Sequence, residues 1–168
     1  KKSGNKYFVM RHGEAKNNVK DVPDQNGDPN NHLTEKGKKE AEKIDGAEFD
    51  IVITSPFLRT RETAEIIKKD FIVDERLHEV GPAEDGMQLR RRMGEFIFDI
   101  ETRYKKKNIL IISHGMPLWV LGKVFSGDRS DNFVAQSQPH TGEMKELEFV
   151  SYPHNENFEL DLHRPYID

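Results

Sequence analysis

The sequence contains no cysteine among its 168 residues. Disulfide bonds, thiolate metal sites and a cysteine nucleophile are therefore all excluded. There is also no excess of positive charge, because 26 lysines and arginines stand against 30 aspartates and glutamates, for a net charge of -4. A global basic field for nucleic acid or for an anionic membrane is thus absent. Any anion binding must come from the local placement of a few side chains.

Long hydrophobic runs are missing as well. No apolar stretch approaches the length of about 18 residues that suggests a membrane helix, and the mean hydropathy is negative. Residues 1–6 are polar and lead at once into a predicted strand, which is unlike a signal peptide, although a signal peptide already removed would leave no trace. We expect a cytoplasmic protein that binds neither nucleic acid nor a membrane. The sequence does not indicate the oligomeric state.

Short apolar runs are present, and they predict strands. Three such runs each end in a turn, at residues 7–10, 50–54 and 108–113. They are continuous rather than alternating, which is typical of strands covered by helices on both faces of a parallel sheet. At this length one domain is the default. We therefore predict a single domain over residues 1–168 with a three-layer α/β/α sandwich around a mostly parallel sheet.

Helical patterns lie between the predicted strands. One helix begins after Thr34, a plausible N-cap, and two more cover residues 58–68 and 87–104 with apolar residues at helical spacing. Residues 144–150 are expected to add a late strand, antiparallel or at an edge, and residues 158–162 a short last one. Trp119 and its apolar neighbours are expected to belong to the core.

Two polar segments do not fit the alternation of strands and helices. Residues 15–32 contain only Val19 and Val22 as substantial apolar side chains, and residues 74–86 are similar but shorter. A long structureless connection in a small domain is usually functional or mobile. The first segment is therefore either a lid that selects the substrate or a disordered connection.

Residues suited to phosphate chemistry follow the three predicted strands. In open α/β sheets ligands collect beyond the carboxyl ends of the strands. Histidine can attack phosphorus with a neutral imidazole, arginine offers planar donors to phosphate oxygens, and glycine lets the backbone come close. The residues at these ends are Arg11, His12 and Gly13, then Ser55 and Arg59, then His114 and Gly115.

These residues form three motifs in a fixed order along the chain. The motifs are Arg11-His12-Gly13-Glu14 with Asn18 shortly after it, Ser55-Pro56-Phe57-Leu58-Arg59-Thr60, and Ser113-His114-Gly115. Together they resemble the signature of the histidine phosphatase superfamily, whose members share a phosphoglycerate mutase-like fold and an Arg-His-Gly (RHG) motif. The resemblance runs from about Tyr7 to Leu121 and covers most of the chain.

The resemblance implies a role for each matching residue. His12 would become phosphohistidine, and the phosphoryl oxygens would be held by Arg11, Asn18, Arg59 and His114. No metal and no cofactor is implied. Family members place a general acid on the loop between the second and third motifs, and Leu77-His78-Glu79 resembles its position. Glu79 is therefore the candidate acid, with Glu84 and Asp85 of the same loop as alternatives.

Other polar residues have simpler interpretations. Glu14 favours a helix N-terminus or orients an arginine. Arg61 is predicted to be solvated, and so is most of the run Arg90 to Arg92, of which Arg90 is best placed to meet a second phosphate. The turn at residues 140–142 is expected to be a surface loop that could reach the site. The remaining histidines show no zinc-ligand spacing.

The expected reaction is hydrolysis of phosphate monoesters on a small molecule or a phosphoprotein. Family mutases are longer than this chain and close over their substrate with insertions, which favours hydrolysis here. The small bacterial phosphohistidine phosphatases also resemble the chain but tend to lack the loop carboxylate, so Glu79 favours monoesters, with protein phosphohistidine as the alternative. A phosphate-binding module without turnover would not need the nucleophile His12.

Overall fold

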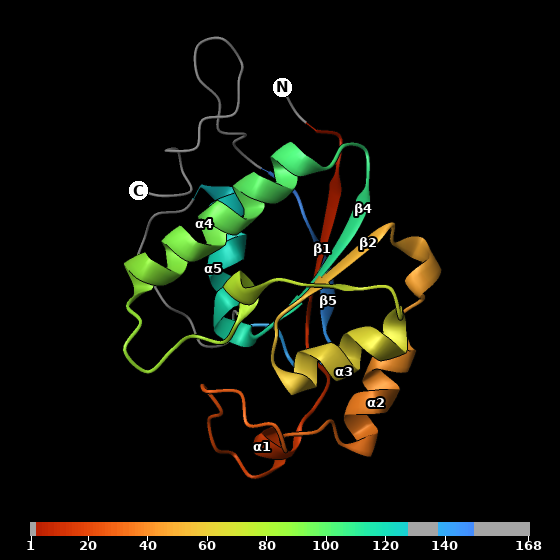
Figure 1. Ribbon diagram of the computed structural model, residues 1–168, viewed down its shortest axis with the longest axis vertical. Coiled ribbons are helices and arrows are strands. Elements are labelled where there is room, and N and C mark those ends of the chain that lie inside the picture. The colour runs from red at the N-terminus through yellow and green to blue at the C-terminus, as the bar shows by residue number, and fades with distance from the viewer. Residues whose placement is uncertain (1–2, 128–137, 150–168) are drawn as a thin grey trace.

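The computed structural model describes residues 3–127 and 138–149 (Figure 1). Five strands form one sheet in the order β3-β2-β4-β1-β5. Strands β1 to β4 run parallel to one another, and β5 is antiparallel to β1 at an edge. The strands are β1 (Lys6–Arg11), β2 (Ile51–Thr54), β3 (Ile72–Val73), β4 (Asn108–Ser113) and β5 (Met144–Leu147). The predicted strands and the antiparallel edge strand are confirmed, but β5 ends at Leu147, before the predicted end at residue 150. Residues 150 and 158–162 lie outside the described residues.

Helices cover both faces of the sheet, which confirms the three-layer sandwich. Helices α4 (Gly86–Arg103) and α5 (Gly115–Ser126) pack on one face, and α2 (Glu35–Glu42) and α3 (Leu58–Ile67) pack on the other (Figure 1). Strand β4 supplies Ile109 and Ile111 to the first face and Leu110 and Ile112 to the second. All four are buried, and this explains the continuous apolar run.

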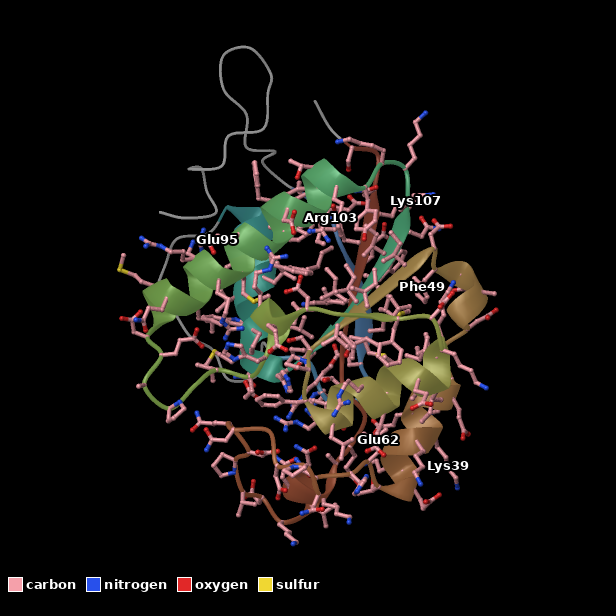
Figure 2. The ribbon with its side chains drawn as sticks, in the orientation of Figure 1. Lys39, Phe49, Glu62, Glu95, Arg103 and Lys107 are labelled. Carbon is pink, nitrogen blue, oxygen red and sulfur yellow. The ribbon has the colours of Figure 1, made fainter. Side chains whose placement is uncertain are left out.

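The helix boundaries follow from their caps. The Thr34 hydroxyl accepts a hydrogen bond from the Gly37 N–H at 3.1 Å, as predicted for an N-cap of α2. Asp85 and Gln88 form a capping box that begins α4 at Gly86, one residue before the predicted start. Charged side chains on the outer surfaces of these helices, such as Lys39, Glu95 and Arg103, are exposed (Figure 2).

Some elements were not evident in the sequence. Helix α5 is apolar almost all round, so its residues predicted a core but no helical period. Within it Trp119 is only partly buried against the core, and Lys123 lies over its ring with Nζ 4.6 Å from the centroid. The two-residue strand β3 is too short to carry a pattern. No helix in the described ranges combines the length and apolar character needed to span a membrane.

The polar segment 15–32 is ordered, so the disordered alternative is wrong. It begins with the short helix α1 (Lys16–Val19), and an isolated bridge pairs Ala15 with Leu33. Asn17 and Asn31 bond each other twice, backbone N–H to Oδ1 at 3.0 Å and side chain to side chain at 2.9 Å. Asn31 is buried although polar. Amide hydrogen bonds therefore replace apolar packing in this segment.

Candidate active site

The carboxyl ends of β1, β2 and β4 meet at one edge of the sheet. The register pairs Arg11 with Ser113, and Thr54 with Ile112. The next residues are therefore neighbours, and the rings of His12 and His114 lie 5.4 Å apart between centroids. Both histidine side chains are buried. The structure thus brings together the strand-end residues that the sequence placed far apart.

His12 is held in one tautomer, in which Nε2 is unprotonated. Its Nδ1 lies 2.7 Å from the Gly13 carbonyl oxygen, which can only accept, so we assign the ring proton to Nδ1. Its Nε2 accepts from Arg59 Nε at 3.2 Å. Burial, reinforced by the charge of Arg59, lowers the pKa of His12 to about 3. The imidazole is therefore neutral, and the lone pair of its unprotonated Nε2 is directed at Arg59 Nε.

Gly13 allows this turn to lie against helix α2. A Cβ at this position would stand 2.4 Å from the Gly37 carbonyl oxygen, and a Cβ at Gly37 would stand 2.1 Å from the Glu14 carbonyl oxygen. The two glycines therefore let two backbones touch directly. Glu14 itself accepts from the Thr34 hydroxyl at 2.9 Å and lies 3.4 Å from Lys36 Nζ, so it secures the start of α2.

His114 offers a buried N–H that has no hydrogen-bond partner within the described residues. Its Nε2 lies 2.8 Å from the Ser55 hydroxyl, which also accepts from the Phe57 N–H. We assign the serine proton to the hydrogen bond with Nε2, which leaves the ring proton of His114 on Nδ1. This Nδ1 has no hydrogen-bond partner among the described residues. Burial lowers the pKa of His114 well below its usual value. A neutral donor thus faces the site.

Two arginines lie beside the histidines. Arg11 Nη1 donates to the Pro139 carbonyl at 3.1 Å, while its buried Nε has no hydrogen-bond partner in the described ranges. Arg59 is buried, and it does not pair with Glu62 or Glu65 as an isolated helical arginine would. Instead its Nη1 binds Asp24 Oδ2 at 2.7 Å, and its Nη2 binds the Asp24 carbonyl oxygen at 2.9 Å.

Glu79 faces both a histidine and an arginine. Its Oε2 lies 3.7 Å from His114 Nδ1 and 3.7 Å from Arg59 Nη2. Burial raises the pKa of Glu79 above its usual value, although the Val80 N–H and the charge of Arg59 oppose that shift. A raised pKa favours the protonated carboxyl group, which is the state that a proton donor needs.

The alternative carboxylates are engaged elsewhere. Glu84 forms a double hydrogen bond with Arg92, at 2.9 Å from Nε and 2.7 Å from Nη2. Although burial opposes it, this ion pair lowers the pKa of Glu84. Asp85 caps α4. Arg92 also donates to the His78 carbonyl at 2.8 Å. It therefore braces the loop that carries Glu79, whereas the sequence suggested a mostly solvated arginine run.

Asn18 and the turn at residues 140–142 also touch the site. Asn18 lines the cavity, and its Oδ1 accepts from the Ala15 N–H at 2.9 Å. The Gly142 N–H donates to the Arg11 and His12 carbonyl oxygens at 3.1 and 3.0 Å. His140 is exposed. The turn thus supports the backbone of the first motif and brings no histidine to the site.

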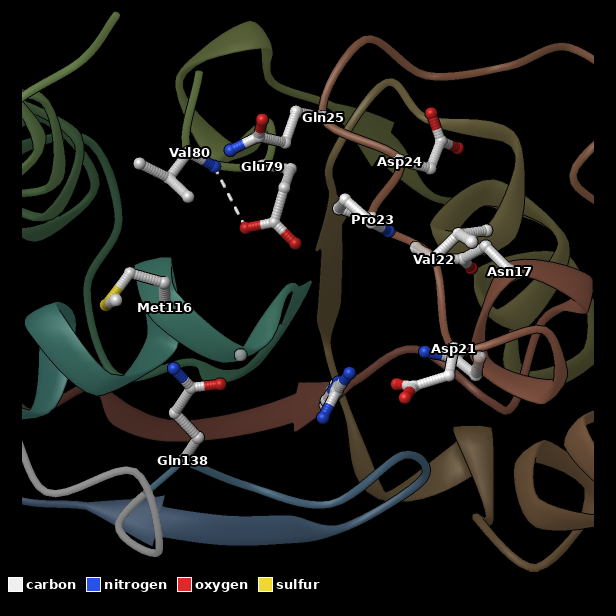
Figure 3. Close-up of a pocket in the computed structure, with 13 residues that line it drawn as sticks. Asn17, Asp21, Val22, Pro23, Asp24, Gln25, Glu79, Val80, Met116 and Gln138 are labelled. Carbon is white, nitrogen blue, oxygen red and sulfur yellow. Dashed lines mark hydrogen bonds between the residues drawn. The ribbon is translucent and has the colours of Figure 1, made fainter. Parts of the chain in front are cut away.

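A cavity of about 430 Å³ lies beside these residues, and Arg11, Asn18 and Glu79 are part of its lining (Figure 3). The segment 17–25 forms one wall, Glu79 and Val80 a second, and Gly115, Met116 and Gln138 a third. Sequence reasoning missed the wall residues Asp21 and Asp24, because no motif marks them. Within the described ranges no group of three or more His, Asp or Glu side chains is arranged to hold a metal ion.

A neutral imidazole, two arginines and a carboxyl group lie together at this edge of the sheet, and Arg11 and Glu79 of this group also line the cavity. Such a group can bind a phosphoryl group and attack it. The fold and this arrangement define an enzyme of phosphoryl transfer. The chain belongs to the histidine phosphatase superfamily, branch 1, whose family model matches residues 7–85 and 81–154. Membership of that family identifies it as a phosphatase-type enzyme. A comparison with curated protein sequences gives no match.

Solved structures of phosphatases share this fold. The alpha-ribazole phosphatase of Shigella flexneri is 22% identical, with a TM-score of 0.66 over 91% of this chain and 92% of its own. A mycobacterial glucosyl-3-phosphoglycerate phosphatase is 15% identical, with a TM-score of 0.64 over 84% and 88%. The phosphoserine phosphatase of Entamoeba histolytica is 19% identical, with a TM-score of 0.60 over 69% and 77%. These identities are low, so the likeness concerns the fold.

Proposed function

We propose that this protein is a metal-independent phosphatase that hydrolyses phosphate monoesters through a phosphohistidine intermediate on His12. The observation that carries the proposal is the state of the His12 ring. Its Nδ1–H donates a hydrogen bond to the Gly13 carbonyl oxygen, and its Nε2 lone pair lies next to the Arg59 guanidinium, where a phosphoryl group would be held. A neutral imidazole fixed in this way is a nucleophile at neutral pH.

In the first half of the reaction His12 Nε2 attacks phosphorus and the bond to the leaving oxygen breaks. The developing charge on the equatorial oxygens is stabilised by Arg11, Arg59 and the Nδ1–H of His114, with the Asn18 side chain as a further donor. Glu79, 3.7 Å from both His114 and Arg59, donates a proton to the leaving oxygen. The products of this step are a free alcohol and phosphohistidine.

In the second half a water molecule attacks the phosphohistidine. Glu79 is now a carboxylate and accepts a proton from that water, while the nitrogen–phosphorus bond breaks and His12 regains its lone pair. Inorganic phosphate leaves through the cavity. Positioning and charge stabilisation by the chain's own side chains account for each step.

We further propose that residues 1–168 act as one domain. Strand β4 lies between β1 and β2, so segments from both halves of the sequence form one sheet. The substrate is proposed to be a small phosphorylated molecule. Phosphatases of this fold act on small esters, as their names state for phosphoserine, alpha-ribazole phosphate and glucosyl-3-phosphoglycerate. Protein phosphohistidine is the alternative, and it would need little help from Glu79, because a protonated imidazole leaves readily.

The test is a set of rates measured with a chelator present. An aryl phosphate, a panel of small phosphate monoesters and a phosphohistidine peptide are each offered to the protein and to His12→Ala. We expect monoester turnover that is lost in the variant, and acid-labile, base-stable phosphate on the parent protein after rapid quenching. Near-native rates in His12→Ala would contradict the mechanism. Turnover of the phosphohistidine peptide alone would replace the monoester proposal by the alternative.

A further inference from the structure

Asp24 is an acidic residue in the cavity wall that the proposed mechanism does not use. It belongs to the segment 15–32 and lines the cavity together with Glu79. Its Oδ2 is 2.7 Å from Arg59 Nη1, and its carbonyl oxygen is 2.9 Å from Arg59 Nη2. A fixed carboxylate therefore stands next to the arginine that would hold the phosphoryl group.

The Asp24 carboxylate is preorganised by its own loop. Oδ1 accepts from the N–H groups of Gly27 and Asp28, both at 3.0 Å, and Oδ2 accepts from Asn31 Nδ2 at 2.8 Å. Although burial opposes ionisation, these donors and the charge of Arg59 lower the pKa of Asp24. Asp24 thus carries a negative charge that cannot move without losing several hydrogen bonds.

The charges around the cavity are unevenly shared. Arg11 is the one cation among the described residues that line it, whereas Asp21, Asp24 and Glu79 are acidic (Figure 3). The two arginines Arg11 and Arg59 are matched in number by Asp21 and Asp24, and Glu79 adds a further carboxyl group. A bound phosphoryl dianion then leaves excess negative charge. This negative charge repels a further anion on the leaving group and attracts a cation. At a separation of several ångströms, each effect changes the binding affinity by about tenfold relative to a neutral leaving group.

We propose that Asp24 is a specificity-determining residue that selects phosphate monoesters with a cationic or neutral leaving group and rejects those that carry a second anionic group. When phosphoryl oxygens accept hydrogen bonds from Arg59, the positive charge of Arg59 is shared between Asp24 and the phosphoryl group. An ammonium group of the substrate then compensates the excess negative charge. The inference rests on the proposed phosphatase function and names the class of substrate for the same site.

The test compares three alkyl esters of similar size that differ in the charge of the leaving group. These are O-phosphoethanolamine with an ammonium group, glycerol 1-phosphate without charge, and 3-phosphoglycerate with a carboxylate. An aryl phosphate serves as the common reference. We expect kcat/KM to fall in that order, with the first ester favoured over the last by at least about tenfold. Equal values, or the reverse order, would overturn the inference.

Asp24→Asn removes the charge and keeps an oxygen that can accept from Gly27. We expect the preference for O-phosphoethanolamine over 3-phosphoglycerate to shrink about tenfold in this variant. The matched control is Asp28→Asn in the same loop, since the Asp28 side chain is exposed, accepts from the Asn30 N–H and does not line this cavity. In Asp28→Asn we expect the preference for O-phosphoethanolamine over 3-phosphoglycerate to equal that of the parent protein. An unchanged preference in Asp24→Asn would overturn the assignment.

Two further results separate the possible failures. If Asp24→Asn does not fold, the parent protein is assayed at rising salt, where a charge-based preference must decline toward one because of screening, and a constant preference counts against the inference. If the aryl phosphate is turned over but the three alkyl esters show no order by charge, the inference is overturned while the proposed function stands. No turnover of any ester overturns the proposed function, and the inference falls with it.

Discussion

The catalytic floor and the cavity wall are built in different ways. We call the floor the strand-end residues Arg11, His12, Ser55 and His114, of which Arg11 lines the cavity, and their backbone continues the sheet. The His12 N–H donates to the Ser113 carbonyl at 3.1 Å, and the Ser55 N–H donates to the Ile112 carbonyl at 3.0 Å. The wall is the segment 17–25, which is mostly exposed and held by side-chain amides and carboxylates of its own loop.

This difference separates two tasks. A floor fixed by sheet hydrogen bonds and buried side chains keeps the reacting groups in place, as chemistry at phosphorus requires. A wall held by local polar contacts can change in sequence without disturbing the core. We therefore propose that the sheet edge carries the catalytic groups and that the polar loop selects the substrate, and the variants below test this division.

The largest effect is expected for Glu79→Gln. Alkyl phosphates should slow by about 10²–10⁴-fold, because an alkoxide is a poor leaving group without a proton, whereas aryl phosphates should slow only severalfold. Because burial raises the pKa of Glu79, the rate on alkyl esters should fall as pH rises through that pKa, and this decline should vanish in the variant. Steady-state rates against pH for both esters measure the effect, and equal slowing would place the acid elsewhere.

The next effect is on folding. Gly37→Ala places a Cβ 2.1 Å from the Glu14 carbonyl oxygen, so helix α2 must move away from the loop behind the floor. We expect a loss of about 2 kcal/mol or more in the free energy of unfolding, and a melting temperature lower by roughly 4–8 °C. Gly122→Ala in α5 is the matched control, since its Cβ meets nothing within 4 Å. It should gain about 0.5–1 kcal/mol, and an equal loss at both glycines would refute the packing account.

The floor also makes stability depend on pH. His12 is neutral in the folded protein because burial lowers its pKa to about 3, while the unfolded chain takes up a proton near the ordinary histidine pKa of 6.5. The unfolded state thus binds more protons between these values, and stability falls as pH drops below about 6.5, by at most about 1.4 kcal/mol per pH unit for this residue.

Urea unfolding between pH 7 and pH 5 tests this dependence. His12→Asn should show a shallower loss of stability toward acid than the parent protein, because asparagine takes up no proton. His140→Asn, a change at an exposed side chain, should leave the slope unaltered. Parallel curves for the parent and His12→Asn would mean that the ring is charged in the folded state.

The smallest effect is expected in the wall. Asn31→Ala removes the amide that joins Asn17 and Asp24, at a cost of about 1 kcal/mol. Backbone amides of the segment 15–32 should exchange faster with solvent, while those of the sheet keep their protection. Asn30→Ala, at an exposed neighbour, provides the control. Faster exchange throughout the sheet in Asn31→Ala would show that wall and floor unfold as one unit.

Much of the fold could be predicted from the sequence because its signals are local. Continuous apolar runs marked β1, β2 and β4, helical spacing marked α3 and α4, and Thr34 marked the start of α2. Helix α5 escaped because apolar residues surround it and leave no period, and β3 because two residues carry no pattern. The segment 15–32 looked structureless since its order comes from amide pairs such as Asn17 with Asn31, which leave no periodic trace.

The sequence by itself determined the residue types of the floor and their places after strands, because strand ends and motif order are properties of the chain. Only the tertiary structure assigns the three carboxylates of one loop to different contacts. Glu79 faces His114, Glu84 pairs with Arg92, and Asp85 caps α4. The same holds for the contact between Asp24 and Arg59, which are 35 positions apart. Side chains so distant in sequence meet only when the sheet and its loops bring them together, since burial and charge act through space and not along the chain.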